Sequence, residues 1–384
     1  QAARGQLAKV RLDIDPATAT SSLSFAQRQL VELAKVLTLE ERIDGDLVIL
    51  LDEPTSVLAE DEVEMLFTIV RDLTKRASFI FVSHRMDEVM ALSDRIYVMK
   101  DGEVVDVVTR GAATIEDIQR KMVGRNVDRE YYREQRQQPY DAAKVLVEMQ
   151  GVSLPGRIRD ISLTLHAGEV LCLVGTEGSG REAILRTIYG MRTPVAGKLT
   201  LKGQPVSSFS PQAAVAAGVG YVPRERKVEG IVAGMTVYEN MTLSQLDRHS
   251  HAGVLKVAGE RALARDWIAR LKVKASSEYV DCGNLSGGNQ QKVVLAKWRS
   301  GGSDILLLDH PTRGLDIGAK EDVYEMIRDM SGEGVGIILV ADTLEEAIGL
   351  SHTIIVLRDG EIRQRFDCRP GAKPSLFDLL HHMI

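Results

Sequence analysis

The chain has 384 residues, more than one ordinary domain of roughly 150 residues, and this length predicts two domains. A composition of 44% hydrophobic and 27% charged residues is that of a globular protein and excludes fibrous and disordered classes. The formal net charge of −6 argues against a protein that coats nucleic acid by neutralising phosphates. Three scattered cysteines favour a reducing compartment, and no apolar run approaches the roughly 20 residues that span a bilayer.

Apolar periodicity predicts alternating helices and short buried strands along the chain. In chain order the segments are helix 27–39, strand 48–51, strand 170–174, helix 181–190, helix 259–271, helix 290–300, strand 305–308, helix 320–330 and strand 337–340. Glycine or aspartate bounds the short apolar runs, as is typical of buried parallel strands. The alternation predicts an α/β fold with a mostly parallel sheet.

Four segments of the sequence occur twice in the same order. Leu47–Thr55 ends in Leu-Asp-Glu-Pro-Thr and matches Asp304–Thr312, which ends in Leu-Asp-His-Pro-Thr. The other three pairs are 23–29 with 285–291, 79–84 with 337–342, and 96–103 with 354–361. Collinear matches at a nearly constant offset indicate two copies of one domain.

The two copies differ in length. Only 22 residues precede the Leu-Ser stretch of the first copy, so it lacks the front half in which a phosphate loop is expected. Residues 124–144 are charged, rich in glutamine and arginine, and without apolar periodicity, which predicts a linker. We therefore predict the later part of a first domain over 1–123 and a complete second domain over 145–384.

Gly175–Glu182 reads Gly-Thr-Glu-Gly-Ser-Gly-Arg-Glu and joins the strand 170–174 to a helix. This is the context of a Walker A loop, in which backbone N–H groups and a helix N-terminus hold phosphate oxygens. The residues expected to contact phosphate are Gly175, Gly178, Ser179, Gly180, Arg181 and Glu182. Arg181 replaces the usual lysine but keeps a cation, whereas Glu182 replaces the hydroxyl residue that binds Mg²⁺ and is expected mostly to repel phosphate. A glycine-rich turn without a ligand is the alternative, and the motifs downstream disfavour it.

Each copy has an apolar strand that ends in aspartate, Asp52 or Asp309, as is typical of a residue that holds Mg²⁺ in a Walker B motif. Glu53 follows the first aspartate and is suited to orient or deprotonate an attacking water. His310 follows the second and does not fit this role, because an imidazolium beside Mg²⁺ is unfavourable. For either aspartate alone, an acid that only caps the end of a strand is the alternative.

Three further motifs carry a family resemblance. Leu285–Lys292 (Leu-Ser-Gly-Gly-Asn-Gln-Gln-Lys), Asp309–Asp316 and Ser83-His84 resemble the signature, Walker B/D-loop and switch-histidine motifs of ABC transporter ATPases. The Asn-Gln-Gln-Lys variant, Val222–Lys227 with Gly230 and the tandem duplication are similar to the fused two-cassette ATP-binding subunits of bacterial importers of the ribose, galactose and xylose type. The resemblance covers essentially the whole chain and implies two tandem ABC-type cassettes, each a P-loop NTPase-like sheet with a helical subdomain, the first N-terminally truncated.

The resemblance also implies that the cassettes face each other head to tail, with each ATP between the Walker motifs of one and the signature of the other. One site would combine Asp52, Glu53, His84, Ser286, Gly287, Gly288, Asn289 and Asp316. Glu53 would position water and His84 would hold the γ-phosphate, while Ser286 and the glycine amides stabilise developing charge. We expect this site to hydrolyse ATP.

The second site would gather the altered residues of both copies: Gly175–Glu182, Asp309, His310, Asp342 in place of the switch histidine, and the opposing Ser24 and Gln27. In that opposing signature Phe25-Ala26 replaces Gly-Gly. We expect this site to bind nucleotide weakly or without turnover. Arg224 and Glu225 lie near the Q-loop position and are predicted to signal to a membrane subunit, with a solvated charged run as the alternative.

The implied function is an ATPase with ATP and Mg²⁺ that drives a bacterial importer for a monosaccharide or sugar alcohol. Its expected partners are a dimer of transmembrane permease subunits and a periplasmic or extracellular sugar-binding protein, not nucleic acid. It would lie peripherally on the cytoplasmic face of the membrane. Two alternatives stay open: a soluble duplicated ABC ATPase acting on ribosomes or DNA, and a truncated remnant without hydrolysis. This chain alone is expected to hydrolyse ATP weakly or not at all.

Overall fold

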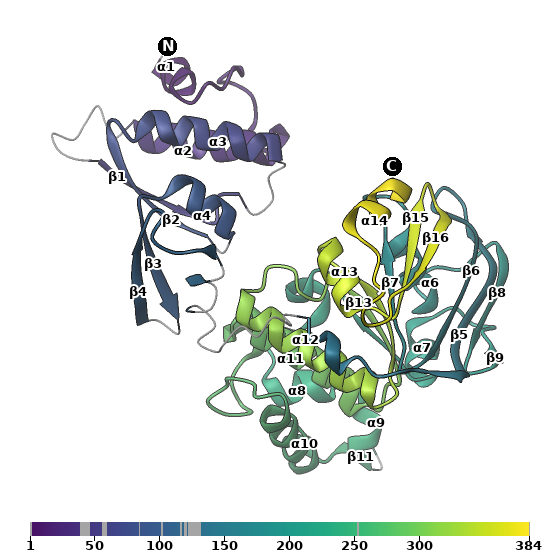
Figure 1. Cartoon of the computed structure of the whole chain (residues 1–384). Helices are drawn as coiled ribbons and strands as arrows, with labels where there is room; N and C mark the ends of the chain where they lie inside the picture. The colour runs from purple at the N-terminus through teal and green to yellow at the C-terminus, as the bar shows by residue number, and fades with distance from the viewer. Residues whose placement is uncertain are drawn as a thin grey trace. The chain divides into compact units, whose positions relative to one another are not determined.

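The computed structural model of the chain divides into two compact units, residues 1–126 and 127–384 (Figure 1). The structure describes residues 2–38, 47–55, 60–83, 85–100, 103–115, 117–118, 121, 132–251 and 253–383. Each unit has apolar cores of its own, so each is held together by its own buried side chains.

The first unit runs from purple to blue in Figure 1. Its elements are α1 (Ala2–Lys9), α2 (Phe25–Leu37), β1 (Leu47–Asp52), α3 (Glu60–Leu73), β2 (Ala77–Val82), α4 (Met86–Leu92), β3 (Arg95–Lys100) and β4 (Glu103–Thr109). Strands β1 and β2 pair in parallel, and β3 and β4 form an antiparallel hairpin. Helices α2 and α3 pack on one face of β1, where Leu30, Ile49 and Ile69 meet.

The strand predicted over 48–51 is present, but the expectation that it is buried on both faces is wrong for the described residues. Ile49 is 2% exposed, whereas Leu50 is 73% exposed. The reason is that α2 and α3 cover one face of β1, and β2 is its only strand partner in the described part of the unit. Such a strand alternates between core and solvent.

The second unit runs from teal to yellow in Figure 1. Its strands are β5 (Asp141–Leu154), β6 (Ile158–Ala167), β7 (Val170–Val174), β8 (Ala196–Leu201), β9 (Gln204–Pro205), β10 (Val219–Val222), β11 (Ser250–His251), β12 (Val254–Leu255), β13 (Ile305–Asp309), β14 (Gly336–Val340), β15 (Thr353–Arg358) and β16 (Glu361–Asp367). Its helices are α6 (Arg181–Ile188), α7 (Pro211–Ala216), α8 (Val237–Thr242), α9 (Leu246–His249), α10 (Val257–Arg270), α11 (Gly287–Ser300), α12 (Ile317–Gly332), α13 (Leu344–Leu350) and α14 (Leu376–Met383).

A central sheet with the order β10-β13-β14-β7-β15-β16 organises this unit. All its neighbouring strands pair in parallel except β15 and β16. Every residue of β7, β13 and β14 is buried, since α6 and α12 both pack against the sheet. The predicted α/β class is confirmed, and continuous apolar runs of this kind are typical of parallel strands covered on both faces.

Two layers flank this sheet. Strands β6, β5, β8 and β9 form a second, antiparallel sheet in that order. Helices α8, α10 and α11 pack on one another and form the helical subdomain (Figure 1). Among the described residues, every helix is too short or too polar to cross a bilayer.

The predicted helices are present, with starts that differ where a cap decides them. The helix predicted over 290–300 begins at Gly287, because its first turn runs through the glycine pair that sequence patterns treat as a breaker. The helix predicted over 320–330 begins at Ile317, because the Asp316 side chain accepts a hydrogen bond from the Ala319 N–H and caps the helix at that point.

The predicted linker 124–144 is wrong over its second half. Arg136 forms ion pairs with Asp329 at 2.5 Å and with Glu325 at 3.5 Å, and the Tyr132 ring lies 5.3 Å from the ring of Tyr324. Strand β5 already begins at Asp141. Residues 132–144 therefore belong to the second unit. Ion pairs and backbone hydrogen bonds hold them, and because such contacts need no regular spacing of apolar residues, the sequence gives no periodic signal there.

His352 fixes this segment to the central sheet. The Val170 N–H donates to Nδ1 of His352 at 2.9 Å, and Nε2 lies 2.8 Å from the Gln138 carbonyl oxygen. Because Nδ1 accepts, the ring is neutral with its proton on Nε2. Burial lowers the pKa of His352 below its ordinary value, although the Gln138 carbonyl works in the opposite direction. A second proton would break the bond from Val170.

We therefore expect the free energy of unfolding to fall as the pH drops below the ordinary histidine pKa of 6.5. The unfolded imidazole binds a proton in this range and the folded one does not, so acid favours the unfolded chain. Urea unfolding at about pH 7.5 and about pH 5.5 measures the effect. The chain should lose on the order of 1 kcal/mol more than a His352→Gln variant, whose side chain does not titrate. An equal loss in both proteins would contradict the role of His352.

Candidate functional site

The turn between β7 and α6 is shaped by glycines. Gly178 and Gly180 have φ angles of 82° and 102°, in the left-handed region that favours glycine. A Cβ atom at Gly180 would lie 2.6 Å from Cγ2 of Ile158 and 2.9 Å from the Arg157 carbonyl oxygen, so only glycine fits there. Gly180 also stands at the N-cap of α6, whose first N–H groups have no partner within the helix.

Ser179 is the buried residue of this loop. It is 2% exposed, and its hydroxyl oxygen has no hydrogen-bond partner among the residues that the structure describes. The Ser179 carbonyl oxygen accepts from the Gly360 N–H at 3.1 Å, which holds the loop to the turn between β15 and β16. An unpaired buried hydroxyl is costly and is typical of a place that binds a further polar group.

Arg181 and Glu182 begin α6 and contact each other. Nη2 of Arg181 lies 3.2 Å from Oε1 of Glu182, and the two side chains are only 13% and 25% exposed. Nε of Arg181 is buried without a partner in the described part of the chain. The cation expected to face phosphate is therefore already paired with the carboxylate that replaces the metal-binding hydroxyl.

A cavity of about 510 Å³ opens beside the loop. Its lining includes Gly178 and Gly180, three arginines (Arg157, Arg186 and Arg192) and one carboxylate, Glu182. Positive charge exceeds negative charge on these walls. The cavity and the free N–H groups at the start of α6 together favour an anionic ligand such as a chain of phosphates.

Asp309 at the end of β13 is 1% exposed, and both of its oxygens have partners. The Tyr221 hydroxyl donates to Oδ2 at 2.8 Å, and Nδ1 of His310 lies 2.8 Å from Oδ1. Burial by itself raises the pKa of Asp309, but the hydrogen bonds from His310 and Tyr221 outweigh it and hold the pKa below its ordinary value. The carboxylate is ionised and fully hydrogen-bonded inside the protein.

The residues after the two aspartates have the same backbone. Glu53 and His310 have φ angles of 42° and 51°, which non-glycine residues rarely adopt. The Glu53 N–H donates to the Val82 carbonyl at 2.8 Å, and the His310 N–H donates to the Val340 carbonyl at 2.9 Å. The two copies thus hold a carboxylate and an imidazole at one and the same strained position.

A buried threonine–glutamate pair is also repeated and is one that sequence reasoning missed. The Thr55 hydroxyl lies 2.5 Å from Glu88, and the Thr312 hydroxyl lies 2.9 Å from Glu346. The Thr312 hydroxyl also donates to Asp342 at 2.8 Å. Burial and the nearby Glu346 raise the pKa of Asp342. The matching offset of the two pairs was the available signal.

Ser286 and Asn289 stand at the start of α11. Nδ2 of Asn289 donates to the Ser286 hydroxyl at 2.8 Å, and Oδ1 of Asn289 accepts from the Lys274 N–H at 2.8 Å. Ser286 is exposed. A Cβ atom on Gly287 would lie against Arg226, and one on Gly288 would lie 2.7 Å from Cβ of Ala319. The glycine pair therefore lets the helix start approach α12 while Ser286 faces outward.

The first copy uses the same positions differently. The Ser24 hydroxyl accepts from the Gln27 N–H at 3.2 Å, and Oε1 of Gln27 accepts from the Ser24 N–H at 2.9 Å. This is a complete capping box at the start of α2. Both side-chain oxygens accept in this cap, whereas the Ser24 O–H and the Gln27 Nε2 group are not used as donors in it.

Arg224, Glu225 and Arg226 follow β10. Arg226 donates to the Arg313 carbonyl at 2.7 Å, and Glu225 forms an ion pair with Arg313 at 3.4 Å. These contacts join the predicted coupling loop to the segment after His310. Nε of Arg224 is buried without a partner among the described residues.

Some predicted site features are outside what the structure shows. His84 lies outside the described residues, as does Ala59 at the first D-loop. The pairing of motifs from the two copies stays a prediction. Among the described side chains, no group of three or more His, Cys, Asp or Glu converges as a metal site.

Sequence reasoning also missed Tyr221 and Arg186. The Arg186 guanidinium interacts with the Tyr221 hydroxyl and with Asp309, and these interactions raise the pKa of Arg186 despite the opposing effect of burial. The two residues are 35 positions apart in sequence and meet only because α6 packs beside the central sheet. An arginine within the helix that follows the loop was the available signal.

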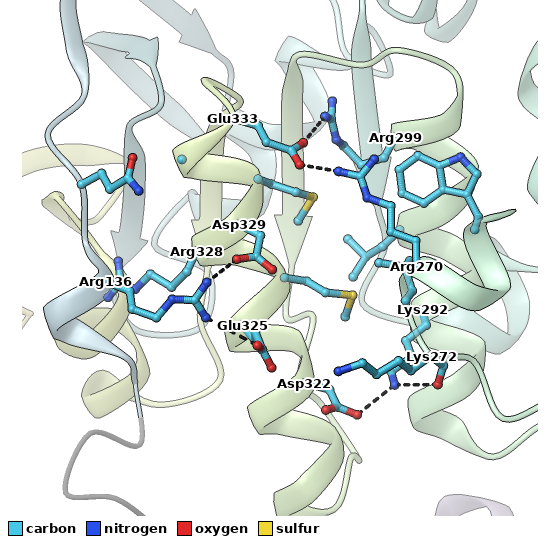
Figure 2. A pocket seen from close by; sticks show the side chains of 17 residues that line it. Arg136, Arg270, Lys272, Lys292, Arg299, Asp322, Glu325, Arg328, Asp329 and Glu333 are labelled. Atoms are coloured by element: carbon cyan, nitrogen blue, oxygen red, sulfur yellow. Dashed lines mark hydrogen bonds and ion pairs between the residues drawn. The ribbon is translucent and has the colours of Figure 1, made fainter.

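A second cavity, of about 380 Å³, lies between α10, α11 and α12 and holds none of the predicted site residues (Figure 2). Ion pairs cross it, among them Lys292 with Asp322 at 2.9 Å and Arg299 with Glu333 at 2.7 Å. Trp267 adds apolar surface to its lining. The charged side chains in these pairs bind one another. We therefore interpret the cavity as part of the packing between the helical subdomain and α12.

Comparison with known proteins places this geometry in a family. Residues 158–313 match the family model described as ABC transporter. The chain is 38% identical over 366 residues to the ribose import ATP-binding protein RbsA 1 of Agrobacterium fabrum, covering 95% of this chain and 70% of that protein. It is 38% identical over 364 residues to the ribose import ATP-binding protein RbsA of Chromobacterium violaceum, covering 94% of this chain and 71% of that protein.

Among solved structures, the chain resembles the ATP-binding cassette MJ0796 in a dimeric post-hydrolysis state bound to ADP and phosphate. The TM-score is 0.51 at 20% identity, over 59% of this chain and 100% of that one. A likeness at this identity concerns the fold alone, and it agrees with the sheet and helical subdomain described above. By identity and coverage, the chain belongs to the ABC transporter family of ATP-binding proteins, together with the ribose import ATP-binding proteins.

Proposed function

We propose that this chain is the ATP-binding and ATP-hydrolysing subunit of a bacterial importer for a monosaccharide or sugar alcohol, with one competent and one degenerate nucleotide site. The observation that carries the proposal is the shared backbone of Glu53 and His310 after the strand-terminal aspartates. One position has a carboxylate that can act on water, and the other has an imidazole. The relatives named as ribose import proteins support a sugar as the cargo.

A tandem arrangement of two cassettes is supported by the order of elements. The first unit runs α2-β1-α3-β2-α4-β3-β4, and the second repeats the same kinds of element as α11-β13-α12-β14-α13-β15-β16. The phosphate loop and the strands that support it precede α11 in the second unit. We propose that a segment ahead of Gln1 in a longer protein supplies the corresponding part of the first cassette.

In the competent site, Asp52 would hold Mg²⁺ with ATP, Glu53 would position the attacking water, and His84 would hold the γ-phosphate. The exposed Ser286 and the free N–H groups at the start of α11 would face this ATP from the second cassette. The other residues proposed for this nucleotide site are Gly287, Gly288, Asn289 and the D-loop residue Asp316. Stabilisation of charge on the γ-phosphate by such fixed dipoles is a large term in phosphoryl transfer.

In the degenerate site, the loop 175–182 and the arginine-lined cavity would hold the phosphates of a nucleotide that is not turned over. His310 does not supply the carboxylate expected at this position, and its Nδ1 lies 2.8 Å from Oδ1 of Asp309. In the opposing signature Phe25-Ala26 replaces Gly-Gly, so fewer backbone amides can approach the nucleotide. Both differences slow hydrolysis at the same site.

The proposed partners are membrane-spanning permease subunits and a sugar-binding protein outside the membrane, with this chain on the cytoplasmic face. The loop at Arg224 and Glu225 would carry the signal, since Glu225 and Arg226 contact Arg313 in the segment after His310. A change at the nucleotide would thus reach the loop through direct contacts.

The phosphate loop can be tested with a matched pair of glycine variants. Gly180→Ala should weaken ATP binding to this chain at least about tenfold, because the added Cβ meets Ile158 and the Arg157 backbone. Gly178→Ala has a similar positive φ but open space around the Cβ, so it should cost less. Isothermal titration calorimetry measures both. Equal losses, or no loss at Gly180, would contradict a phosphate-binding role for the loop.

The asymmetry of the two sites can be tested in the longer protein assembled with its permease. Glu53→Gln should lower ATP hydrolysis at least about 100-fold, since it removes the group that acts on water. His310→Ala should change the rate by less than about twofold, because no proton transfer depends on it. Phosphate release measures both rates. Equal losses from the two substitutions would contradict the proposal of one competent site.

A further inference from the structure

The two positions at which the second cassette would hold a metal are both engaged by other groups. Tyr221 and His310 occupy the two oxygens of Asp309. Glu182, in place of a hydroxyl residue, contacts Arg181. A metal ion bound with ATP needs oxygen ligands that are free to turn toward it. Asp309, predicted to hold Mg²⁺, does not fit that role in this arrangement.

The acidic side chains nearby do not form a substitute site. Glu182, Asp309 and His310 are each suited to ligate a metal, but among the described residues no three such side chains converge. The hydrogen bonds on Asp309 are also internal to the protein, since the residue is 1% exposed. Breaking them to admit an ion would take the acceptor from the Tyr221 O–H and the partner from the Nδ1 atom of His310, which is costly inside a protein.

A cationic side chain lines the cavity beside the phosphate loop. The guanidinium of Arg186 lines the cavity beside Gly178 and Gly180 and also interacts with Tyr221, Glu229 and Asp309. Its Nε is buried without a partner in the described part of the chain, so one donor remains for a ligand. Arginine matches phosphate oxygens in geometry as well as in charge. A second cation of double charge next to it would be repelled.

We propose that the degenerate site of the second cassette binds ATP without a divalent metal, with the Arg186 guanidinium compensating the phosphate charge. This inference rests on the proposed function, because it assumes that the cavity beside the loop receives a nucleotide. It differs from the competent site, for which Asp52 is proposed to hold Mg²⁺ with ATP.

The test compares ATP binding to this chain in excess Mg²⁺ and in excess EDTA by isothermal titration calorimetry. Affinities within about threefold of each other are the expected result. Binding in Mg²⁺ that weakens more than about tenfold in EDTA would overturn metal independence and leave nucleotide binding intact. Absence of binding in both buffers would overturn the proposed nucleotide site itself, so the two failures are distinguishable.

A pair of arginine variants tests the role of Arg186. Arg186→Gln should weaken binding in EDTA at least about tenfold, whereas Arg159→Gln, at an arginine of β6 that is 72% exposed and does not line the cavity, should weaken it less than about threefold. Circular dichroism and thermal unfolding establish that both variants fold. Equal effects of the two substitutions would overturn the assignment to Arg186, and the comparison of buffers in the unmodified chain holds even if Arg186→Gln does not fold.

Discussion

The structure of the second unit depends on one constraint, the burial of its parallel strands on both faces. Because β7, β13 and β14 are fully buried and run in the same direction, their carboxyl ends meet at one edge of the sheet. The phosphate loop, Asp309 and Asp342 follow those ends. Groups that are far apart in sequence are thereby fixed at one edge of the sheet, and a ligand site at the carboxyl edge is the usual outcome for such sheets.

The duplication shows how one backbone can carry two chemistries. A residue with positive φ follows the strand-terminal aspartate in both copies and donates to the same position of the neighbouring strand. Rare conformations of this kind persist where the surrounding structure enforces them. In the first copy the position holds Glu53, and in the second it holds His310, whose ring joins Tyr221 in satisfying a buried carboxylate. A position suited to catalysis has become part of a structural network, and Arg186 belongs to that network.

Much of the fold could be predicted from the sequence, since apolar runs and helical periods report directly on burial. The parallel strands and the helices following the loop and the signature are examples. The segment 132–144 could not be assigned, because Arg136 and His352 hold it through ion pairs and hydrogen bonds that leave no period. The loop and the strand-end aspartates were evident as motifs. Tyr221 and Arg186 were not, because tertiary structure brings them to Asp309: β10 pairs with β13 and places Tyr221 there, and the packing of α6 against β13 places Arg186 there.

The two nucleotide sites are proposed to differ in turnover, and the nucleotides that stay bound after reaction distinguish them. The longer protein, assembled with its permease, would be mixed with labelled ATP and separated rapidly from free nucleotide, and the bound species would be counted. One ADP and one intact ATP are expected for each pair of cassettes. Two ADP molecules for each pair would contradict it, since both sites would then have hydrolysed their nucleotide.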